Sequence, residues 1–323
     1  MCVALLVVVA CPVTTSLSPL TAALKTAIGS QSVVDFEDNR DYCDHWIPEV
    51  EQPQILWDGR AELQPDDVNQ RYEFLHQLGS GTFSQVFLAE DKSTLDQRAI
   101  KVLTKQFYSK YSRRMEAENE LLVLARLPKD EPSVCRYHRF FQDEQHIYQV
   151  FDYCKGRSLA ALVGPNGEDF ARTWTAKIVE ALSRLHSHGI YHMDLNANNV
   201  QVNADKVQII DFGRSVLGDT KRQYNAGAFG YHTPERLSHT AATPSLWDVW
   251  YVGHLAYQLA FGGFAFGFEL TPEYTRKVMS GVPDYPTEPS AELRDLLEKI
   301  FVPEARRIGL AEVAGHAWFT HFK

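Results

Sequence analysis

Apolar and polar positions alternate over short stretches in the first part of the chain and follow helical spacing in the second part. Five stretches between residues 72 and 153 alternate in this way and are bounded by glycines or polar clusters, which is typical of half-buried strands. They cover residues 72–79, 86–90, 98–103, 135–142 and 146–153. One helical stretch lies among them, at residues 111–127, where apolar side chains recur at helical spacing.

From residue 169 onward the spacing is mostly helical, with short strands near Val200 and Val207. The strands therefore precede most of the helices instead of alternating with them. This order predicts an α+β fold, a β-rich half before an α-rich half, and not a doubly wound sheet. Residues 1–69 show no sustained period, so we expect an N-terminal extension, partly ordered at best, before a folded domain at 70–323.

Composition narrows the class of protein only slightly. Hydrophobic residues make up 45% of the 323 positions, which is sufficient for a sizeable core. The net charge of −9 disfavours a general nucleic-acid binder, so we expect no nucleic-acid partner. Five cysteines are scattered without metal-ligand spacing such as C-x-x-C, which indicates free thiols in a reducing compartment.

The first residues contain an apolar run from Val3 to Ala10. It is shorter than the roughly 20 apolar residues that a membrane-spanning helix needs, so no transmembrane segment is predicted. The run fits the low end of a signal-peptide core, but no Lys or Arg precedes Lys25 and the chain has no N-glycosylation sequon. We therefore expect a cytoplasmic protein, with secretion through an atypical signal peptide as the alternative.

Two segments in the strand-rich half have the chemistry to bind phosphate. Gly79, Ser80 and Gly81 lie between two predicted strands, where glycines let the backbone approach phosphates, although a tight hairpin alone would explain them. Lys101 on the third strand could reach such phosphates, and its alternative is a surface lysine on an edge strand. Glu120, nineteen residues later on the predicted helix, could hold that lysine charged and oriented, or it could be a solvated helix residue.

A second group of polar residues follows the first long helix of the α-rich half. Asp194 is followed by Asn199 five residues later, and Asp211 comes twelve residues after that. Phosphoryl transfer needs a carboxylate that accepts a hydroxyl proton and two oxygen ligands that hold magnesium. Each of these residues alone would be a polar loop residue, and only their spacing taken together indicates this chemistry.

Residues 72–321 resemble the serine/threonine branch of the eukaryotic-type protein kinase superfamily. The resemblance rests on the order of motifs: the glycine segment, Lys101, Glu120, His192-x-Asp194, Asn199, Asp211-Phe212-Gly213, Thr233-Pro234-Glu235 and Asp248. It implies a bilobal kinase fold with an N-lobe at 70–153 and a C-lobe at 154–323. It also implies transfer of the γ-phosphate of ATP, with Mg²⁺, to serine or threonine hydroxyls of protein substrates.

The resemblance assigns a role to each motif residue. Lys101 would contact the α- and β-phosphates and pair with Glu120, Asp194 would be the catalytic base, and Asn199 and Asp211 would bind magnesium. The nucleotide would lie among residues from both lobes, with Phe151 as gatekeeper and residues 152–154 as the hinge: Gly79, Ser80, Gly81, Val86, Ala99, Lys101, Phe151, Asp152, Cys154, Ser158 and Gln201.

Three structural roles also follow from the resemblance. Asp248 would anchor the catalytic loop, and Glu235 would form an ion pair with Arg307. The spine that joins the lobes would be a stack of Tyr137, Leu124, Phe212 and His192.

The chain departs from the family pattern at several positions. Met193 replaces the arginine that commonly receives an activation-loop phosphate, so we hypothesise that activity does not depend on phosphorylation of Ser215, Thr220 or Tyr224. Asn196 and Ala228 replace a lysine and a threonine that usually meet near the substrate. Ser84 replaces the third glycine, and Gln201 replaces the apolar residue that usually forms the floor under adenine.

Three function hypotheses remain. An active serine/threonine kinase is favoured because the set Lys101, Glu120, Asp194, Asn199 and Asp211 is intact. A pseudokinase, which would bind ATP or a partner without catalysis, is supported by the departures in and around the catalytic loop. A small-molecule kinase of related fold is disfavoured by the protein-kinase-like segment 227–235.

Overall fold

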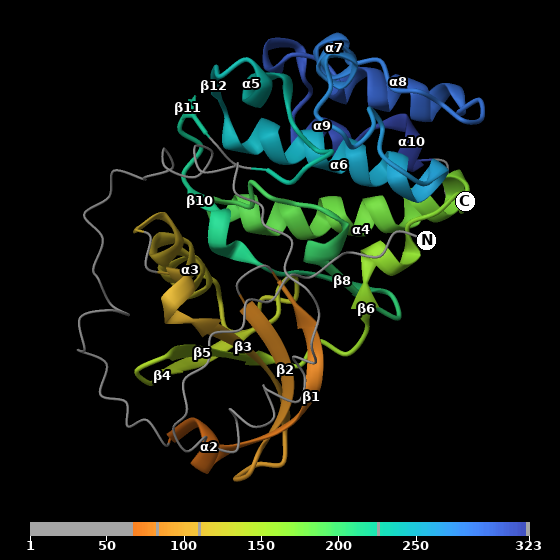
Figure 1. Cartoon of the computed structure of the whole chain (residues 1–323). Helices are drawn as coiled ribbons and strands as arrows, with labels where there is room; N and C mark the ends of the chain where they lie inside the picture. The colour runs from red at the N-terminus through yellow and green to blue at the C-terminus, as the bar shows by residue number, and fades with distance from the viewer. Residues whose placement is uncertain (1–66, 82–83, 109–110, 225–226, 321–323) are drawn as a thin grey trace.

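The computed structural model describes residues 67–81, 84–108, 111–224 and 227–320, which form a strand-rich lobe and a helical lobe (Figure 1). The expected N-terminal extension therefore lies outside the described residues as far as residue 66. Its last residues belong to helix α2 (Asp67–Arg71), which crosses the boundary predicted at residue 70. Val68 of this helix is buried in the core of the N-lobe beside Tyr72.

The N-lobe is built on a five-stranded antiparallel sheet with the order β1-β2-β3-β5-β4. The strands lie close to the predicted stretches: β1 (Tyr72–Ser80), β2 (Ser84–Asp91), β3 (Gln97–Thr104), β4 (Tyr137–Gln142) and β5 (His146–Asp152). A short 3₁₀ helix η1 (Lys105–Tyr108) leads to α3 (Tyr111–Leu124). The predicted α+β bilobal fold is therefore confirmed, with α3 one turn shorter than the predicted helix.

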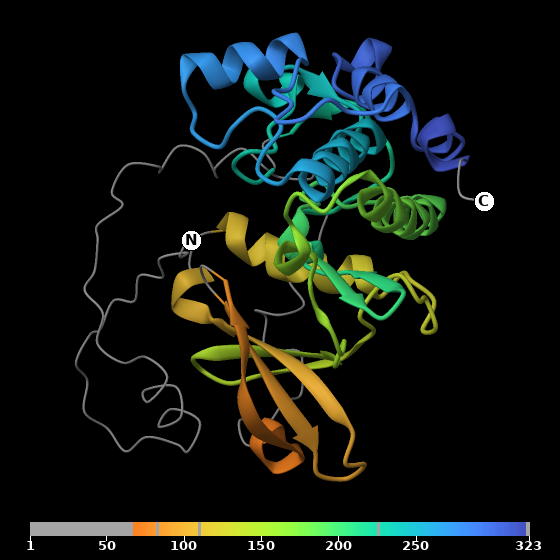
Figure 2. The same cartoon turned by 90° about the vertical axis from the view of Figure 1, so that its right-hand side faces the viewer.

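The pleat of β3 determines which side chains reach the space between the lobes. Ile100 and Val102 point into the core of the N-lobe, where they are 0% and 3% exposed. Successive side chains of a strand point to opposite faces, so Ala99 and Lys101 lie on the other face. Figure 2 shows α3, in yellow, lying between the sheet and the helical lobe. The strand thus presents Lys101 toward that helix.

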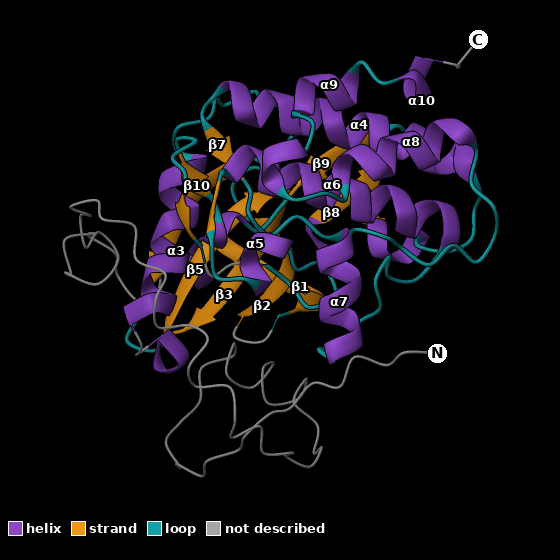
Figure 3. Cartoon of the chain, turned by 90° about the horizontal axis from the view of Figure 1, so that it is seen from above, coloured by secondary structure: helices purple, strands orange, loops and turns teal. Residues whose placement is uncertain are grey.

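The C-lobe packs its helices around α4 (Glu168–Ser187) and α6 (Pro244–Phe261). Nearly every residue of α6 is buried, including Trp247 and Trp250. Seen from above, α4 and α6 lie beside β8 and β9, and the strands β1, β2, β3 and β5 are visible to one side of them (Figure 3). The other helical elements are η2 (Leu159–Leu162), η3 (Ala197–Asn199), η4 (Phe212–Arg214), α5 (Pro234–Leu237), α7 (Pro272–Ser280), α8 (Ala291–Ile300), η5 (Glu304–Arg306), α9 (Leu310–Ala314) and α10 (Ala317–Thr320).

Short strands lie among the helices of the C-lobe (Figure 1). A three-stranded sheet has the order β6-β8-β9, and two further pairs join β10 to β7 and β11 to β12. Their bounds are β6 (Arg157–Ser158), β7 (Ile190–Tyr191), β8 (Val200–Asn203), β9 (Lys206–Ile209), β10 (Val216–Leu217), β11 (Arg222–Gln223) and β12 (Ala241–Ala242). Among the helices of the described ranges, none combines the length and the apolar character needed to cross a bilayer.

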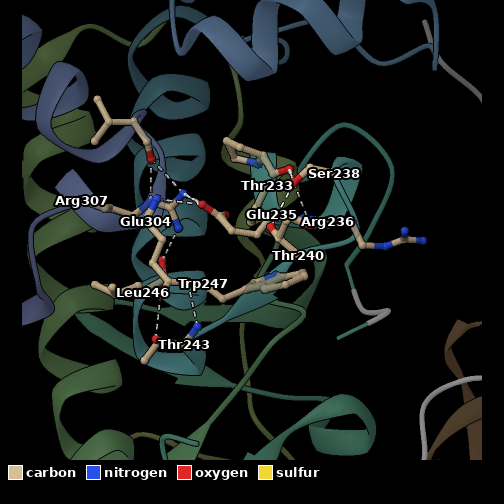
Figure 4. Close-up of polar contacts among 12 residues, drawn as sticks. Thr233, Glu235, Arg236, Ser238, Thr240, Thr243, Leu246, Trp247, Glu304 and Arg307 are labelled. Carbon is tan, nitrogen blue, oxygen red and sulfur yellow. Dashed lines mark hydrogen bonds and ion pairs between the residues drawn. The ribbon is translucent and has the colours of Figure 1, made fainter. Parts of the chain in front are cut away.

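The predicted ion pair between Glu235 and Arg307 is present in the core of the C-lobe (Figure 4). Arg307 Nη2 lies 3.1 and 3.0 Å from the two carboxylate oxygens of Glu235, and its Nη1 donates to the carbonyl of Leu246 at 2.9 Å. The Arg307 side chain is 1% exposed and the Glu235 side chain 7%. The pair joins the start of α5 to the segment after η5, two parts of the chain far apart in sequence.

Removal of one partner leaves a buried charge without compensation, which costs about 3–5 kcal/mol. We expect Glu235→Gln to lower the free energy of unfolding by about that amount in urea titrations. The control is Glu180→Gln, which removes an exposed pair with Arg184 and should cost less than about 1 kcal/mol. Equal losses in the two variants would contradict this account.

The aromatic core of the C-lobe also encloses a histidine. His254 is fully buried against Trp250, Phe266 and Phe301, and neither ring nitrogen has a hydrogen-bond partner among the described residues. Burial lowers the pKa of His254 to about 3. The imidazole ring of His254 is therefore neutral in the folded protein at neutral pH.

Because the folded protein binds fewer protons at His254 than the unfolded chain, stability is complete above about pH 6.5 and declines as the pH falls toward 3. The slope approaches about 1.4 kcal/mol per pH unit for this one group. We expect His254→Met to flatten the dependence of the unfolding free energy on pH in this window. A variant that keeps the wild-type slope would show that another group is responsible.

Candidate active site

A cavity of about 530 Å³ lies between the two lobes. This volume falls in the range of about 300–1,000 Å³ that small-molecule sites occupy. The cavity is lined by every residue that the sequence predicts to contact a nucleotide: Gly79, Ser80, Gly81, Val86, Ala99, Lys101, Phe151, Asp152, Cys154, Ser158 and Gln201. The predicted magnesium ligands Asn199 and Asp211 line it as well.

Strand pairing explains why residues distant in sequence meet in this cavity. Val86 lies opposite Lys101 in the β2–β3 ladder, and Ala99 lies opposite Phe151 in the β3–β5 ladder. Ser158 pairs with Gln201 where β6 meets β8. The strand register therefore brings predicted residues of β2, β3 and β5 to the same cavity as those of β6 and β8.

Several residues line the cavity although the sequence analysis did not predict them to contact a nucleotide. Leu78 and Ile209 each lie next to a predicted motif, and their position in a strand beside that motif was a usable signal. The remaining ones are Leu124, Cys135, Gly156, Arg157, Asn198 and Ile210. Tyr153 and Ser84 also line the cavity, and the sequence had placed them in the hinge and in the glycine segment. Ser158, by contrast, was predicted and is placed by its hydroxyl, which donates to the carbonyl of Ala197 at 2.9 Å.

Cys135 and Cys154 form a disulfide at the edge of this cavity, with their Cα atoms 6.1 Å apart. The prediction that the cysteines are free thiols is therefore wrong for this pair. Sequence spacing failed here because the two residues are nineteen positions apart, at the two ends of the β4–β5 hairpin. Antiparallel pairing brings those ends together.

The ammonium group of Lys101 lies between two carboxylates. Its Nζ is 2.8 Å from Glu120 Oε2 and 3.0 Å from Asp211 Oδ1. The Lys101 ammonium lowers the pKa of Asp211, whereas burial raises the pKa of Glu120 against the opposing effect of Lys101. Strand β3, helix α3 and the turn at η4 are thus tied together at one charged point.

Asp194 lies on the catalytic loop with one oxygen available for a donor. Its Oδ1 is buried and has no hydrogen-bond partner among the described residues. Buried acceptors are nearly always paired, so this oxygen marks a place where a hydroxyl donor would fit. Burial raises the pKa of Asp194 to about 7, and the guanidinium of Arg214, 3.8 Å from Oδ2, opposes the shift.

Asp248 holds the loop that presents Asp194, as predicted. Its carboxylate accepts hydrogen bonds from the backbone N–H groups of His192 and Met193, both at 2.8 Å, and lies 2.9 Å from His186 Nε2. Met193 has a φ of 63°, a conformation that costs a non-glycine residue roughly 1–3 kcal/mol. The two bonds from Asp248 stabilise this turn.

The predicted stack between the lobes is formed in part by direct ring contact. The rings of His192 and Phe212 lie 5.1 Å apart, edge to face. Leu124 belongs to the same hydrophobic cluster, and Tyr137 packs against that cluster. The cluster continues from α3 into the C-lobe, so it couples the helix to the catalytic loop.

Asn199 and Asp211 have the donor set that magnesium prefers. Asn199 Nδ2 donates to the backbone carbonyl of Asp194 at 2.9 Å, which fixes the amide and leaves its oxygen as an acceptor. Magnesium in phosphate-transfer sites takes one or two protein oxygens and completes its shell with phosphate and water. One carboxylate and one amide beside a cavity lined by Gly79 and Lys101 fit this pattern, because the phosphates would supply the other oxygens.

Asn196 shows what replaces the usual lysine. Its side-chain oxygen accepts from the N–H of Asn198 at 3.0 Å, and its nitrogen donates to the carbonyl of Asp194 at 3.0 Å. The side chain therefore stabilises the catalytic loop through local bonds. Gly227 and Ala228 line a second cavity of about 400 Å³ that also contains Asp194.

The fold and this arrangement of charged residues define the class of protein. The sequence pattern of the protein kinase domain matches residues 72–319, so the chain belongs to the protein kinase family. This result confirms the predicted superfamily.

Several protein kinases are similar to more than three quarters of this chain. The 3-phosphoinositide-dependent protein kinase 1 of Rattus norvegicus is 34% identical over 271 residues, 79% of this chain and 48% of the rat protein. The putative 3-phosphoinositide-dependent protein kinase 2 of Homo sapiens is 34% identical over 265 residues, 78% of this chain and 65% of its own. CBL-interacting protein kinase 26 of Oryza sativa subsp. japonica is 30% identical over 258 residues, 77% of this chain and 52% of its own. The chain spans about half to two thirds of the length of these relatives.

Proposed function

We propose that the protein transfers the γ-phosphate of ATP to serine or threonine hydroxyls of protein substrates. The observation that carries this proposal is the convergence of Lys101, Glu120 and Asp211 at one charged point, beside an unpaired buried oxygen of Asp194. Phosphoryl transfer depends mainly on positioning and on electrostatic stabilisation, and these residues supply both.

Each residue has a distinct part in the proposed reaction. Gly79 and Gly81 let the backbone approach the phosphates, and Lys101 neutralises part of their charge. Asn199 and Asp211 would hold magnesium, which supplies charge neutralisation when bound. Asp194 Oδ1 would accept the hydrogen bond of the substrate hydroxyl and take its proton as the new phosphorus–oxygen bond forms. The bond from the γ-phosphorus to the bridging oxygen of ATP would break at the same time, and ADP would leave.

A pseudokinase is the second candidate function, and the bonds of Asn196 favour it. A lysine at this position would add positive charge near the transferred group, whereas the Asn196 side chain is used within the loop. Ala228 removes the hydroxyl that such a lysine would meet. A scaffold that binds ATP without rapid transfer would tolerate both changes.

The deciding experiment measures phosphate transfer from labelled ATP with Mg²⁺ to a mixed peptide library and to the protein itself. The full chain is compared with Asp194→Asn and Lys101→Met, which remove the base and the phosphate contact. We expect both variants to lose transfer by about 100-fold or more. No transfer by the wild type, together with a melting temperature raised by ATP and Mg²⁺, would support the pseudokinase function.

We also propose that activity is independent of phosphorylation after Asp211. The Ser215 side chain is fully buried and donates to the carbonyl of His192, and the Tyr224 hydroxyl donates to the carbonyl of Thr220. Of the three candidate hydroxyl residues, Thr220 alone is exposed. Met193 offers no positive charge to a phosphate at any of them.

Treatment of the purified protein with a phosphatase should therefore leave kcat unchanged, and Thr220→Ala should behave as the wild type does. Mass spectrometry verifies that the phosphatase removed any phosphate. A loss of activity that is reversed by rephosphorylation at Thr220 would overturn this expectation.

A further inference from the structure

Helix α3 directs three polar side chains toward the segment that follows Asp211. Glu116, Asn119 and Glu120 are spaced at i, i+3 and i+4, so they lie on one face of the helix. Only Glu120 belongs to the motifs that the family resemblance identifies. The other two contact the same segment of the chain, and the functional roles assigned so far do not use them.

The side-chain amide of Asn119 meets three backbone carbonyls. Its Nδ2 lies 2.7 Å from the carbonyl oxygen of Ser215, 3.1 Å from that of Gly213 and 3.3 Å from that of Phe212. Asn119 is 5% exposed, so water has little access to these oxygens. An amide nitrogen carries two hydrogens, and here they are shared among three converging acceptors.

Without this donor the carbonyls would be buried and poorly paired. Each unsatisfied buried group carries a desolvation penalty, so the turn over residues 212–215 depends on the Asn119 amide. Phe212 and Ser215 also bond to each other, since Ser215 N–H donates to the carbonyl of Phe212 at 3.0 Å. That single bond does not connect the turn to α3.

Two neighbours on the same helix face secure the turn further. Glu120 Oε1 accepts from the N–H of Phe212 at 3.2 Å. Glu116 Oε1 lies 3.5 Å from Arg214 Nε, and the same guanidinium reaches Asp194. The turn is thus held by side-chain contacts from three positions of one helix.

We propose that Asn119 is a positioning residue that holds the turn after Asp211 against α3 and so keeps the magnesium-binding aspartate in place without a phosphate on the loop. This inference rests on the proposed kinase function. Asp211 directly precedes the first carbonyl that Asn119 binds, so a displaced turn would also move its carboxylate. If the turn is always ordered, no phosphate is needed to order it. The chain can then have Met193 in place of the arginine that would bind such a phosphate.

The test compares Asn119→Asp with the wild type in the full chain. Aspartate keeps the size of the side chain but presents oxygens to the three carbonyls. We expect faster hydrogen exchange at the amides of residues 212–217 without nucleotide, a higher Mg²⁺ concentration for half-maximal activity, and a kcat roughly 10- to 100-fold lower. Asn119→Ala, which deletes the donor without adding charge, should change all three in the same direction.

Asn166, an exposed asparagine of the C-lobe, provides a control for the same chemical substitution. Its Nδ2 also donates to several carbonyls, at 2.7 Å to Leu162 and 3.1 Å to Gly164, far along the chain from the turn. Asn166→Asp should alter the melting temperature without changing the Mg²⁺ dependence. A merely structural Asn119 would give the same result as this control.

The outcomes separate this inference from the proposed function. Wild-type transfer with unchanged exchange and Mg²⁺ dependence in both Asn119 variants would overturn the positioning role. The wild type could transfer no phosphate while the Asn119 variants still show faster hydrogen exchange at residues 212–217. That result would overturn the kinase function, and the role of Asn119 in holding the turn would stand. Poor folding of Asn119→Asp would move the decision to Asn119→Ala, measured below its melting temperature.

Discussion

The position of one ammonium group determines how the rest of the site is arranged. Lys101 can lie within 3.0 Å of both Glu120 and Asp211 only when β3, α3 and the turn at η4 approach each other together. Attraction between opposite charges strengthens as water is removed, so the partly buried setting makes this contact valuable and its loss costly. The hydrophobic cluster through Leu124 and Phe212 supplies the apolar surroundings.

The strand-rich and helix-rich halves, the five strands and the main site residues were all predictable from sequence. Period-2 alternation located β3, and motif order identified Lys101 and Glu120 as partners and Asp211 as a magnesium ligand. The contact between Lys101 and Asp211 was not predicted. Asn119 was not predictable, because an asparagine beside a motif glutamate has no signature in a single sequence. Its role depends on three carbonyls that meet only after the chain turns at residues 212–215.

The structure explains how the chain accommodates Met193 and Asn196, the two departures from the family pattern in the catalytic loop. Met193 is fully buried, so it replaces a charged side chain by an apolar one in the core. The Asn196 side chain stabilises the catalytic loop through hydrogen bonds with the backbone of Asp194 and Asn198. Both residues are compatible with a loop that is ordered by its neighbours, which is what the contacts of Asn119 and Asp248 provide.

The disulfide between Cys135 and Cys154 constrains the segment that joins the two lobes. It joins the two ends of the β4–β5 hairpin, and the chain just before Cys135 also bonds to the C-lobe, where the N–H of Ile209 donates to the carbonyl of Ser133 at 2.8 Å. Beyond Cys154, Gly156 has a φ of 149° and lies against the backbone of Val202. The connection between the lobes is thus held at two points, by a covalent bond at Cys154 and by a close backbone contact at Gly156.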